Sequence, residues 1–150
     1  MNLEHYLKEK NIWHRFVDKP ETIHTADAAA SASIDLHKVT KSLVLLDQDN
    51  KPFLAIIPGD CKLDYAKVRA ALDAKKVRLV PFAEAEQYSG YLPGATAMVY
   101  HKVPMRVVLD AKLSVHETIY GGGGSRTKLL ELKTRDVIQL NHALVADITE

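Results

Sequence analysis

The chain has 150 residues, 47% of them hydrophobic and 26% charged, and a formal net charge of +1. A chain of this length can bury the core of one domain, and its composition excludes a disordered, fibrous or low-complexity protein. Near-neutrality disfavours binding along DNA, long RNA or an anionic membrane. The single cysteine, Cys61, excludes an internal disulfide framework and is typical of a reducing compartment. With no signal peptide or membrane-spanning segment evident, we expect one cytoplasmic domain over residues 1–150.

The hydrophobic pattern, turn residues and capping residues predict a series of short elements. In chain order, they are a helix over 2–10, a strand over 12–17, a short helix from Thr25, strands over 39–46 and 53–57, a helix over 64–74, a strand over 77–80, a short helix over 82–88, strands over about 96–101, 105–110, 117–120 and 127–132, a helix over 135–141 and a strand over 143–148. Thr25 and Asp64 are expected N-caps, because their side-chain oxygens can accept an unpaired amide. Without strict alternation of strands and helices, this order predicts an α+β fold with a mixed, curled sheet.

Lys41 stands out because it shares a strand face with the apolar residues Val39, Leu43 and Leu45. Burying a lysine on such a face is costly unless the ammonium is paired or reaches a cleft. Two interpretations stay open at this point. The lysine lies at a strand end and extends to water, or it supplies a cation to a phosphate or a carbonyl group.

Four consecutive glycines, Gly121 to Gly124, form the second unusual feature. Without side chains, their backbone can approach a ligand closely. The run is not a P-loop, because no Gly-Lys-Ser or Gly-Lys-Thr follows at the required spacing. A ligand-binding loop and a long flexible hairpin are both compatible with it.

A locally basic stretch covers residues 62–78, where six Lys or Arg face two Asp, a surplus of four positive charges. A solvated helix face has this character, and so does a surface that contacts RNA; both interpretations stay open. The seven histidines and one cysteine show no metal-ligand spacing, so we expect no metal and no other cofactor.

Four segments carry a family resemblance: His24–Ala29 (HTADAA), Val39–Leu45 (VTKSLVL), Ser89–Gly94 (SGYLPG) and Glu117–Gly124 (ETIYGGGG). In this order and spacing they resemble the YbaK/prolyl-tRNA synthetase editing-domain family over about residues 12–149. The resemblance implies a barrel-like mixed sheet of about seven strands with short helices around it. It also implies a metal-independent deacylase that acts in trans on mischarged aminoacyl-tRNA, with a synthetase as a further partner.

The resemblance assigns roles to individual residues. Lys41 takes the hallmark lysine position, where it would bind the terminal phosphate or adenosine of the tRNA and orient the ester. Gly94 would supply backbone amides to the substrate carbonyl. The remaining expected substrate-binding residues are His24, Ser42, Ala95, Gly122, Gly123 and Gly124, the last three as walls around a small aminoacyl group such as Ala, Cys or Ser.

Two positions depart from the family pattern: the residue before the glycine pair, often a small polar residue in members that clear cysteine, is Gly122 here, and the glycine loop also differs. The family's glycine loop commonly reads Gly-Gly-x-x-Pro, whereas this chain has Ala95 after Gly94 and Met98 in place of the proline. Two further hypotheses therefore stand beside the deacylase. One is a non-catalytic module that binds tRNA ends or a synthetase; the other is a nucleotide-responsive regulator that uses the Gly121–Gly124 loop.

Overall fold

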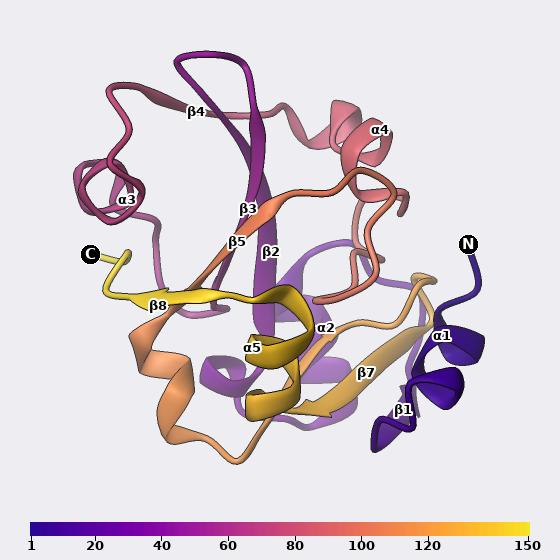
Figure 1. The fold of residues 1–150 in the computed structure, drawn as a ribbon. Helices are drawn as coiled ribbons and strands as arrows, with labels where there is room; N and C mark the ends of the chain where they lie inside the picture. Colours follow the sequence, from indigo (N-terminus) through magenta and orange to yellow (C-terminus); the bar gives the residue numbers. More distant parts are fainter.

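The computed structural model describes all 150 residues, which form two β-sheets with short helices around them (Figure 1). The α-helices are α1 (Leu3–Glu9), α2 (Thr25–Ala32), α3 (Tyr65–Leu72), α4 (Glu86–Ser89) and α5 (Thr134–Asn141). The strands are β1 (His14–Asp18), β2 (Thr40–Asp47), β3 (Pro52–Pro58), β4 (Val77–Leu79), β5 (Arg106–Asp110), β6 (Thr118–Gly122), β7 (Lys128–Lys133) and β8 (Leu144–Ala146). Three 3₁₀ turns complete the set: η1 (Leu36–Lys38), η2 (Phe82–Glu84) and η3 (Ala111–Val115).

The larger sheet has the strand order β4-β2-β3-β5-β8. β2 and β3 form an antiparallel hairpin, and β3 pairs with β5, and β5 with β8, in parallel. Both faces of this hairpin are covered. Val44 on β2 faces the main core, whereas its neighbour Leu45 faces a second apolar cluster that includes Val68 of α3. The prediction of a central strand covered from two sides is therefore confirmed.

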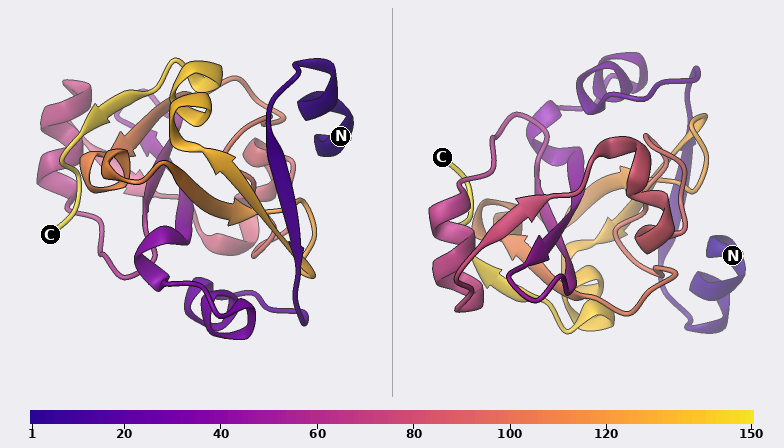
Figure 2. Two further views of the ribbon diagram at one scale, coloured as in Figure 1. Left: turned by 90° about the horizontal axis from the view of Figure 1, so that it is seen from below. Right: turned by 90° about the horizontal axis from the view of Figure 1, so that it is seen from above.

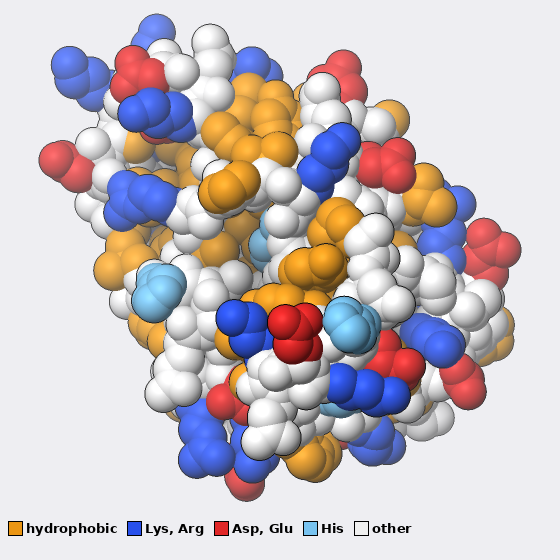
Figure 3. Space-filling model, turned by 45° about the vertical axis from the view of Figure 1, so that its right-hand side comes forward, with side chains coloured by type: hydrophobic (Ala, Val, Ile, Leu, Met, Phe, Trp, Pro, Cys, Tyr) orange, Lys and Arg blue, Asp and Glu red, His pale blue; other side chains and the backbone are white.

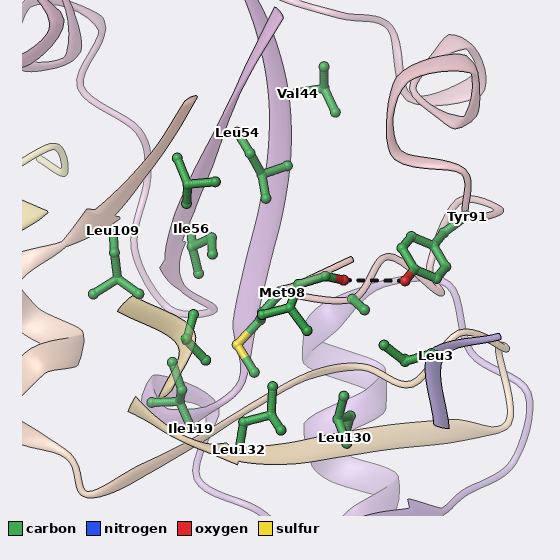
Figure 4. Close-up of a cluster of buried hydrophobic side chains, with 14 of the residues drawn as sticks. Leu3, Val44, Leu54, Ile56, Tyr91, Met98, Leu109, Ile119, Leu130 and Leu132 are labelled. Atoms are coloured by element: carbon green, nitrogen blue, oxygen red, sulfur yellow. Dashed lines mark hydrogen bonds between the residues drawn. The ribbon is translucent and has the colours of Figure 1, made fainter. Parts of the chain in front are cut away.

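The smaller sheet is antiparallel, in the order β1-β7-β6. Its apolar side chains pack with those of the larger sheet into one core, seen in Figure 4 as Leu130 and Ile119 beneath Leu54 and Ile56, with Met98 between them. Two sheets that share one core make the fold a layered α+β structure.

The α+β class is confirmed, but the prediction of one barrel-like sheet of about seven strands is wrong. Eight strands divide into sheets of five and three, and neither sheet closes. The sheets join only at one corner, where Val39 and Tyr120 form an isolated parallel bridge and Thr40 Oγ1 donates to Tyr120 O at 3.0 Å. Beyond this bridge no ladder continues, because β2 and β6 diverge.

The expected strand over 96–101 is also absent, and residues 95–100 form a buried irregular segment instead. Side chains replace a ladder partner here: Tyr91 Oη donates to the carbonyls of Val99 and Tyr100, and Asn141 Nδ2 donates to Met98 O at 2.9 Å. Figure 4 shows the tyrosine hydroxyl bonded into the core. The apolar run at residues 96–101 therefore predicted burial correctly, but its prediction of a strand was wrong.

Two helix boundaries bear on the site. Asp64 caps α3 as predicted, since its carboxylate accepts from Lys67 N at 3.1 Å. Thr25 is not an N-cap: it is the first residue of α2, and His24 occupies the cap without a side-chain bond. Figure 2 places α1 and the N-terminus at the opposite end of the molecule from α3 and the C-terminus. No helix in the chain has the length and apolarity to cross a membrane.

Candidate functional site

A cavity of about 350 Å³ lies beside the Thr40 end of β2, next to the start of α2. Its lining comes from seven separate parts of the chain: residues 23–28 except Asp27, residues 39–43, Gly59, Phe82, the loop of Gly94 and Thr96, Gly122, and Leu129. This size is within the range of small-ligand pockets. The cavity therefore brings together segments of all four motifs or turns that the sequence singled out.

The cavity exists because β2 has a free edge over half of its length. β4 pairs only with Leu45–Asp47, and one further bond joins Val80 N to Val44 O. Peptide groups of alternate residues in an antiparallel strand point to the same edge, so those of Ser42 face the same side as those of Val44. The chain turns away from β2 at Pro81, and the cavity occupies the edge left open beside Ser42.

Lys41 lines this cavity and carries a charge that no carboxylate neutralises. Its Nζ donates to Cys61 O at 3.1 Å, and its side chain is partly exposed. One carbonyl leaves two of the three ammonium protons free for another acceptor. The structure is compatible with both interpretations of Lys41. Its side chain is partly exposed to water, and the residue also borders the cavity, where a ligand could bind.

Ser42 follows Lys41 and also lines the cavity. Its Oγ is the one buried side-chain nitrogen or oxygen atom in the protein without a hydrogen-bond partner. Leaving a buried hydroxyl unpaired costs free energy, so such an atom calls for an explanation. No neighbouring carbonyl accepts from this hydroxyl, and a polar ligand group is the partner that the cavity offers.

The first turn of α2 forms another wall, with His24, Thr25 and Ala26 in contact with the cavity. His24 is exposed, and its imidazole makes no capping bond. The first amide of α2 that bonds within the helix is that of Ala28, which donates to His24 O. Unpaired amides at a helix start carry a partial positive charge, so this wall attracts an anion.

The loop at Gly94 forms a further wall of the cavity. Gly94 has φ +86°, and a Cβ there would lie 2.7 Å from Cα of Ile23, so the position requires glycine. Neither the Gly94 amide nor the Thr96 amide donates a bond within the protein, and both residues line the cavity. Ala95 between them is fully buried and does not line it.

The glycine run has a role that differs from the expected one. Only Gly122 lines the cavity; Gly123 and Gly124 do not. All three amides are already bonded, Gly122 N to Thr96 O, Gly123 N to Lys128 O and Gly124 N to Ala95 O, each at 3.1 Å. A Cβ on Gly122 would lie 2.3 Å from Thr96 O. Gly122 and Gly124 therefore dock β6 and its loop against the Gly94 segment.

Residues outside the cavity hold its walls in place. Arg126 Nε donates to Pro93 O at 2.8 Å, and its Nη1 lies 3.8 Å from Glu21 Oε1. The buried Lys19 donates to Thr22 Oγ1 at 2.5 Å and also to the carbonyl of Arg126. Burial lowers the pKa of the Lys19 ammonium, although Glu21 partly opposes that shift. These contacts tie the loop before α2 to the Gly94 loop and the glycine hairpin.

Five lining residues lie outside the four segments that carried the family resemblance, namely Ile23, Gly59, Phe82, Thr96 and Leu129. In the sequence Gly59 marks only the end of a strand, yet a Cβ there would lie 2.6 Å from Val39 O. Phe82 is 52% exposed, and an exposed aromatic residue after a strand carries no signal of its own in one sequence. Thr96 fell inside the segment that was expected to be a strand.

The side chains around the cavity favour polar binding over nucleophilic attack. Ser42 Oγ has no hydrogen-bond partner, so no histidine activates it. Burial, with Asp60 beside it, raises the pKa of the Cys61 thiol and disfavours the thiolate. No three His, Cys, Asp or Glu side chains are grouped to hold a metal ion. The cavity instead offers an uncompensated ammonium, a helix start and free amides, which suit an anion or a developing oxyanion.

Comparison with known proteins agrees with the architecture. Residues 19–140 match the family model described as "Aminoacyl-tRNA editing domain". The chain superposes on the crystal structure of the hypothetical protein APE2540 with a TM-score of 0.91, at 28% identity and over 99% of both chains.

Two curated proteins are similar in sequence. The chain is 25% identical over 136 residues to the Enterococcus faecalis protein named "Putative Cys-tRNA(Pro)/Cys-tRNA(Cys) deacylase EbsC", covering 91% of this chain and 83% of that protein. It is 29% identical over 97 residues to the proline–tRNA ligase of Limosilactobacillus reuteri, covering 61% of this chain and 17% of that enzyme. The match to a small part of a ligase indicates that a related segment is built into a larger enzyme there.

Proposed function

Because the chain belongs to the family of aminoacyl-tRNA editing domains, we propose that it is a deacylase that hydrolyses the ester between a small amino acid and the 3′ end of a tRNA. The 150 residues act as one editing domain in this proposal. The observation that carries it is the composition of the cavity. Lys41, with no carboxylate partner, and the unbonded amides of Gly94 and Thr96 border the same space.

Lys41 and the start of α2 bind the charged part of the substrate. The terminal nucleotide brings a phosphodiester anion, and the free ammonium protons of Lys41 and the first amides of α2 are suited to it. Binding places the ester carbonyl toward the Gly94 loop. Ser42 Oγ then gains the hydrogen-bond partner that it lacks in the free protein.

Hydrolysis proceeds by attack of a water on the ester carbonyl carbon. Negative charge develops on the carbonyl oxygen, where the amides of Gly94 and Thr96 donate to it; such preorganised donors lower the barrier. When the carbon–oxygen bond to the ribose breaks, the ribose oxygen takes a proton, so free amino acid and intact tRNA leave. The ester is already activated, which is why positioning and two donors suffice without an enzymatic nucleophile or a metal.

A small acyl group fits the proposed reaction because the cavity must also receive part of the terminal nucleotide within about 350 Å³. Cysteine is the first candidate, because the Enterococcus faecalis relative is named for Cys-tRNA. Alanine and serine are the others, since a pocket that rejects by size separates neighbouring small side chains by only about 1–3 kcal/mol.

The test is a deacylation panel with Ala-, Ser-, Cys- and Thr-charged tRNA. We expect wild-type protein to release at least one amino acid, and Lys41→Ala to lower that rate by roughly 10²- to 10³-fold, as loss of a charge-stabilising group does elsewhere. Lys38→Ala is the matched control, because Lys38 lies nearby on η1 and does not line the cavity. If all four charged tRNAs survive, the protein is not a deacylase for small amino acids, and saturable binding without turnover would identify the binding-module alternative.

A further inference from the structure

A second groove lies near the β4 edge of the larger sheet, away from the cavity lining described above. Its volume is about 360 Å³, and it is bordered by residues of β4, the tip of the β2–β3 hairpin and α3. Four of the nine lining residues are cations, namely Arg69, Lys75, Lys76 and Arg78. In Figure 3, Lys and Arg side chains gather at the upper end of the molecule, the end where Figure 1 places β4 and the hairpin tip.

The four cations have no carboxylate partners. Every ion pair in the protein involves other residues, and the one side-chain bond from this set joins Arg78 Nη2 to Asn50 Oδ1 at 3.5 Å. The one carboxylate in the lining, Asp47, uses its Oδ1 to accept the amides of Asp49 and Lys51. Four lysine or arginine charges against one aspartate leave this groove with a net charge of +3.

The groove leads toward the cavity along the chain. Phe82, which also borders the cavity, lies four positions after Arg78, the last groove residue in the chain. Four residues reach at most about 14 Å when fully extended. A ligand that occupies both places must span this distance, present anionic groups to the four cations and be narrow enough at one end to enter the cavity.

We propose that this groove, Arg69, Lys75, Lys76 and Arg78, binds backbone phosphates of the tRNA acceptor end while the 3′ nucleotide occupies the cavity. The inference rests on the proposed function, which supplies the elongated polyanion. Successive phosphates of a nucleic-acid strand can each contact a different one of the four cations, whereas a ligand with a single carboxylate cannot. Neutralising each phosphate releases counterions, so binding depends steeply on salt concentration.

The double variant Lys75→Gln/Lys76→Gln tests the proposal, because both side chains are exposed and make no hydrogen bond. Binding of uncharged tRNA is followed by fluorescence anisotropy between about 50 and 200 mM salt. We expect at least about tenfold weaker binding, and a fall of roughly 1.4–1.8 in the slope of log affinity against log salt, for two lost phosphate contacts. The control Lys8→Gln/Lys10→Gln removes the same charge from α1, which Figure 2 places away from β4.

A kinetic readout separates this inference from the proposed function. With charged tRNA, the groove variant raises KM and leaves kcat unchanged, while the kcat/KM for an aminoacylated trinucleotide stays at the wild-type value. Equal effects of the two double variants on tRNA binding, or no effect of the groove variant, overturn the inference. Groove-dependent binding of uncharged tRNA without any deacylation refutes the proposed function and leaves the phosphate site standing.

Discussion

Replacing Ser42 by alanine separates the stability of the free protein from its activity. The Ser42 hydroxyl is buried and has no hydrogen-bond partner. An unpaired buried hydroxyl costs roughly 1–3 kcal/mol, and alanine removes the hydroxyl and leaves only a space the size of one oxygen atom. We therefore expect Ser42→Ala to stabilise the folded protein while it weakens the binding of the charged substrate.

The expected gain in the free energy of unfolding is about 1 kcal/mol, since the space left behind offsets part of the relieved cost. For a chain of this length, that corresponds to a rise of roughly 2–4 °C in Tm. Urea unfolding monitored by circular dichroism measures the free energy, and the slope with urea must stay constant for the comparison to hold. Deacylation by the same preparation is expected to fall.

Ser89→Ala is the matched control. Ser89 is also buried, but its Oγ accepts from Tyr91 N at 3.1 Å and donates to Tyr91 O at 3.4 Å. Its loss leaves a buried amide unpaired, so the control should lose about 1–3 kcal/mol of stability. If Ser42→Ala destabilises the protein as much as Ser89→Ala does, the reasoning about Ser42 is refuted.

Three further predictions follow from particular contacts. Gly122→Ala should lose about 1–3 kcal/mol because its Cβ would lie 2.3 Å from Thr96 O, as measured by urea unfolding; an unchanged free energy of unfolding would contradict the close packing of β6 on the Gly94 segment. Burial lowers the pKa of His101, although its bond to Ala97 O opposes this, so the unfolded chain takes up the proton first and stability falls as pH drops below about 6.5. His101→Gln should reduce the dependence of the free energy of unfolding on pH, by at most about 1.4 kcal/mol per pH unit. If wild type and variant show the same slope of free energy against pH, the assignment to His101 is contradicted. Arg126→Ala frees the Pro93 carbonyl and should raise KM for charged tRNA more than it lowers kcat, whereas an effect confined to kcat would place Arg126 in the chemistry itself.

Local sequence signals predicted the elements that depend on local physics. The turn between β2 and β3 and the Asp64 cap were readable because a turn or cap is decided within a few residues. Lys41 was identifiable as a cation on an apolar strand face, which is an unusual pattern. All of these features are set by residues near one another in the chain.

Long-range contacts decided the rest. The segment 95–100 has the composition of a strand. Its carbonyls, however, accept hydrogen bonds from the side chains of Tyr91, His101 and Asn141. The local sequence does not predict that these side chains are the donors. The roles of Gly122 and Gly124 likewise depend on the Gly94 segment, more than 25 residues earlier. The division into two sheets follows from where β2 and β6 diverge, which hydrophobic periodicity does not encode.

The bracing by Arg126 and Lys19 has a consequence for how such a pocket evolves. Neither residue borders the cavity, yet together they fix the spacing between the Gly94 loop and the segment that leads into α2. Arg126 and Lys19 thus control the width of the opening, whereas the residues that line the cavity make the contacts with a ligand. Under the proposed function, a lineage can change which acyl groups the cavity admits by substitutions at Arg126 and Lys19, while the residues that line the cavity are inherited unchanged.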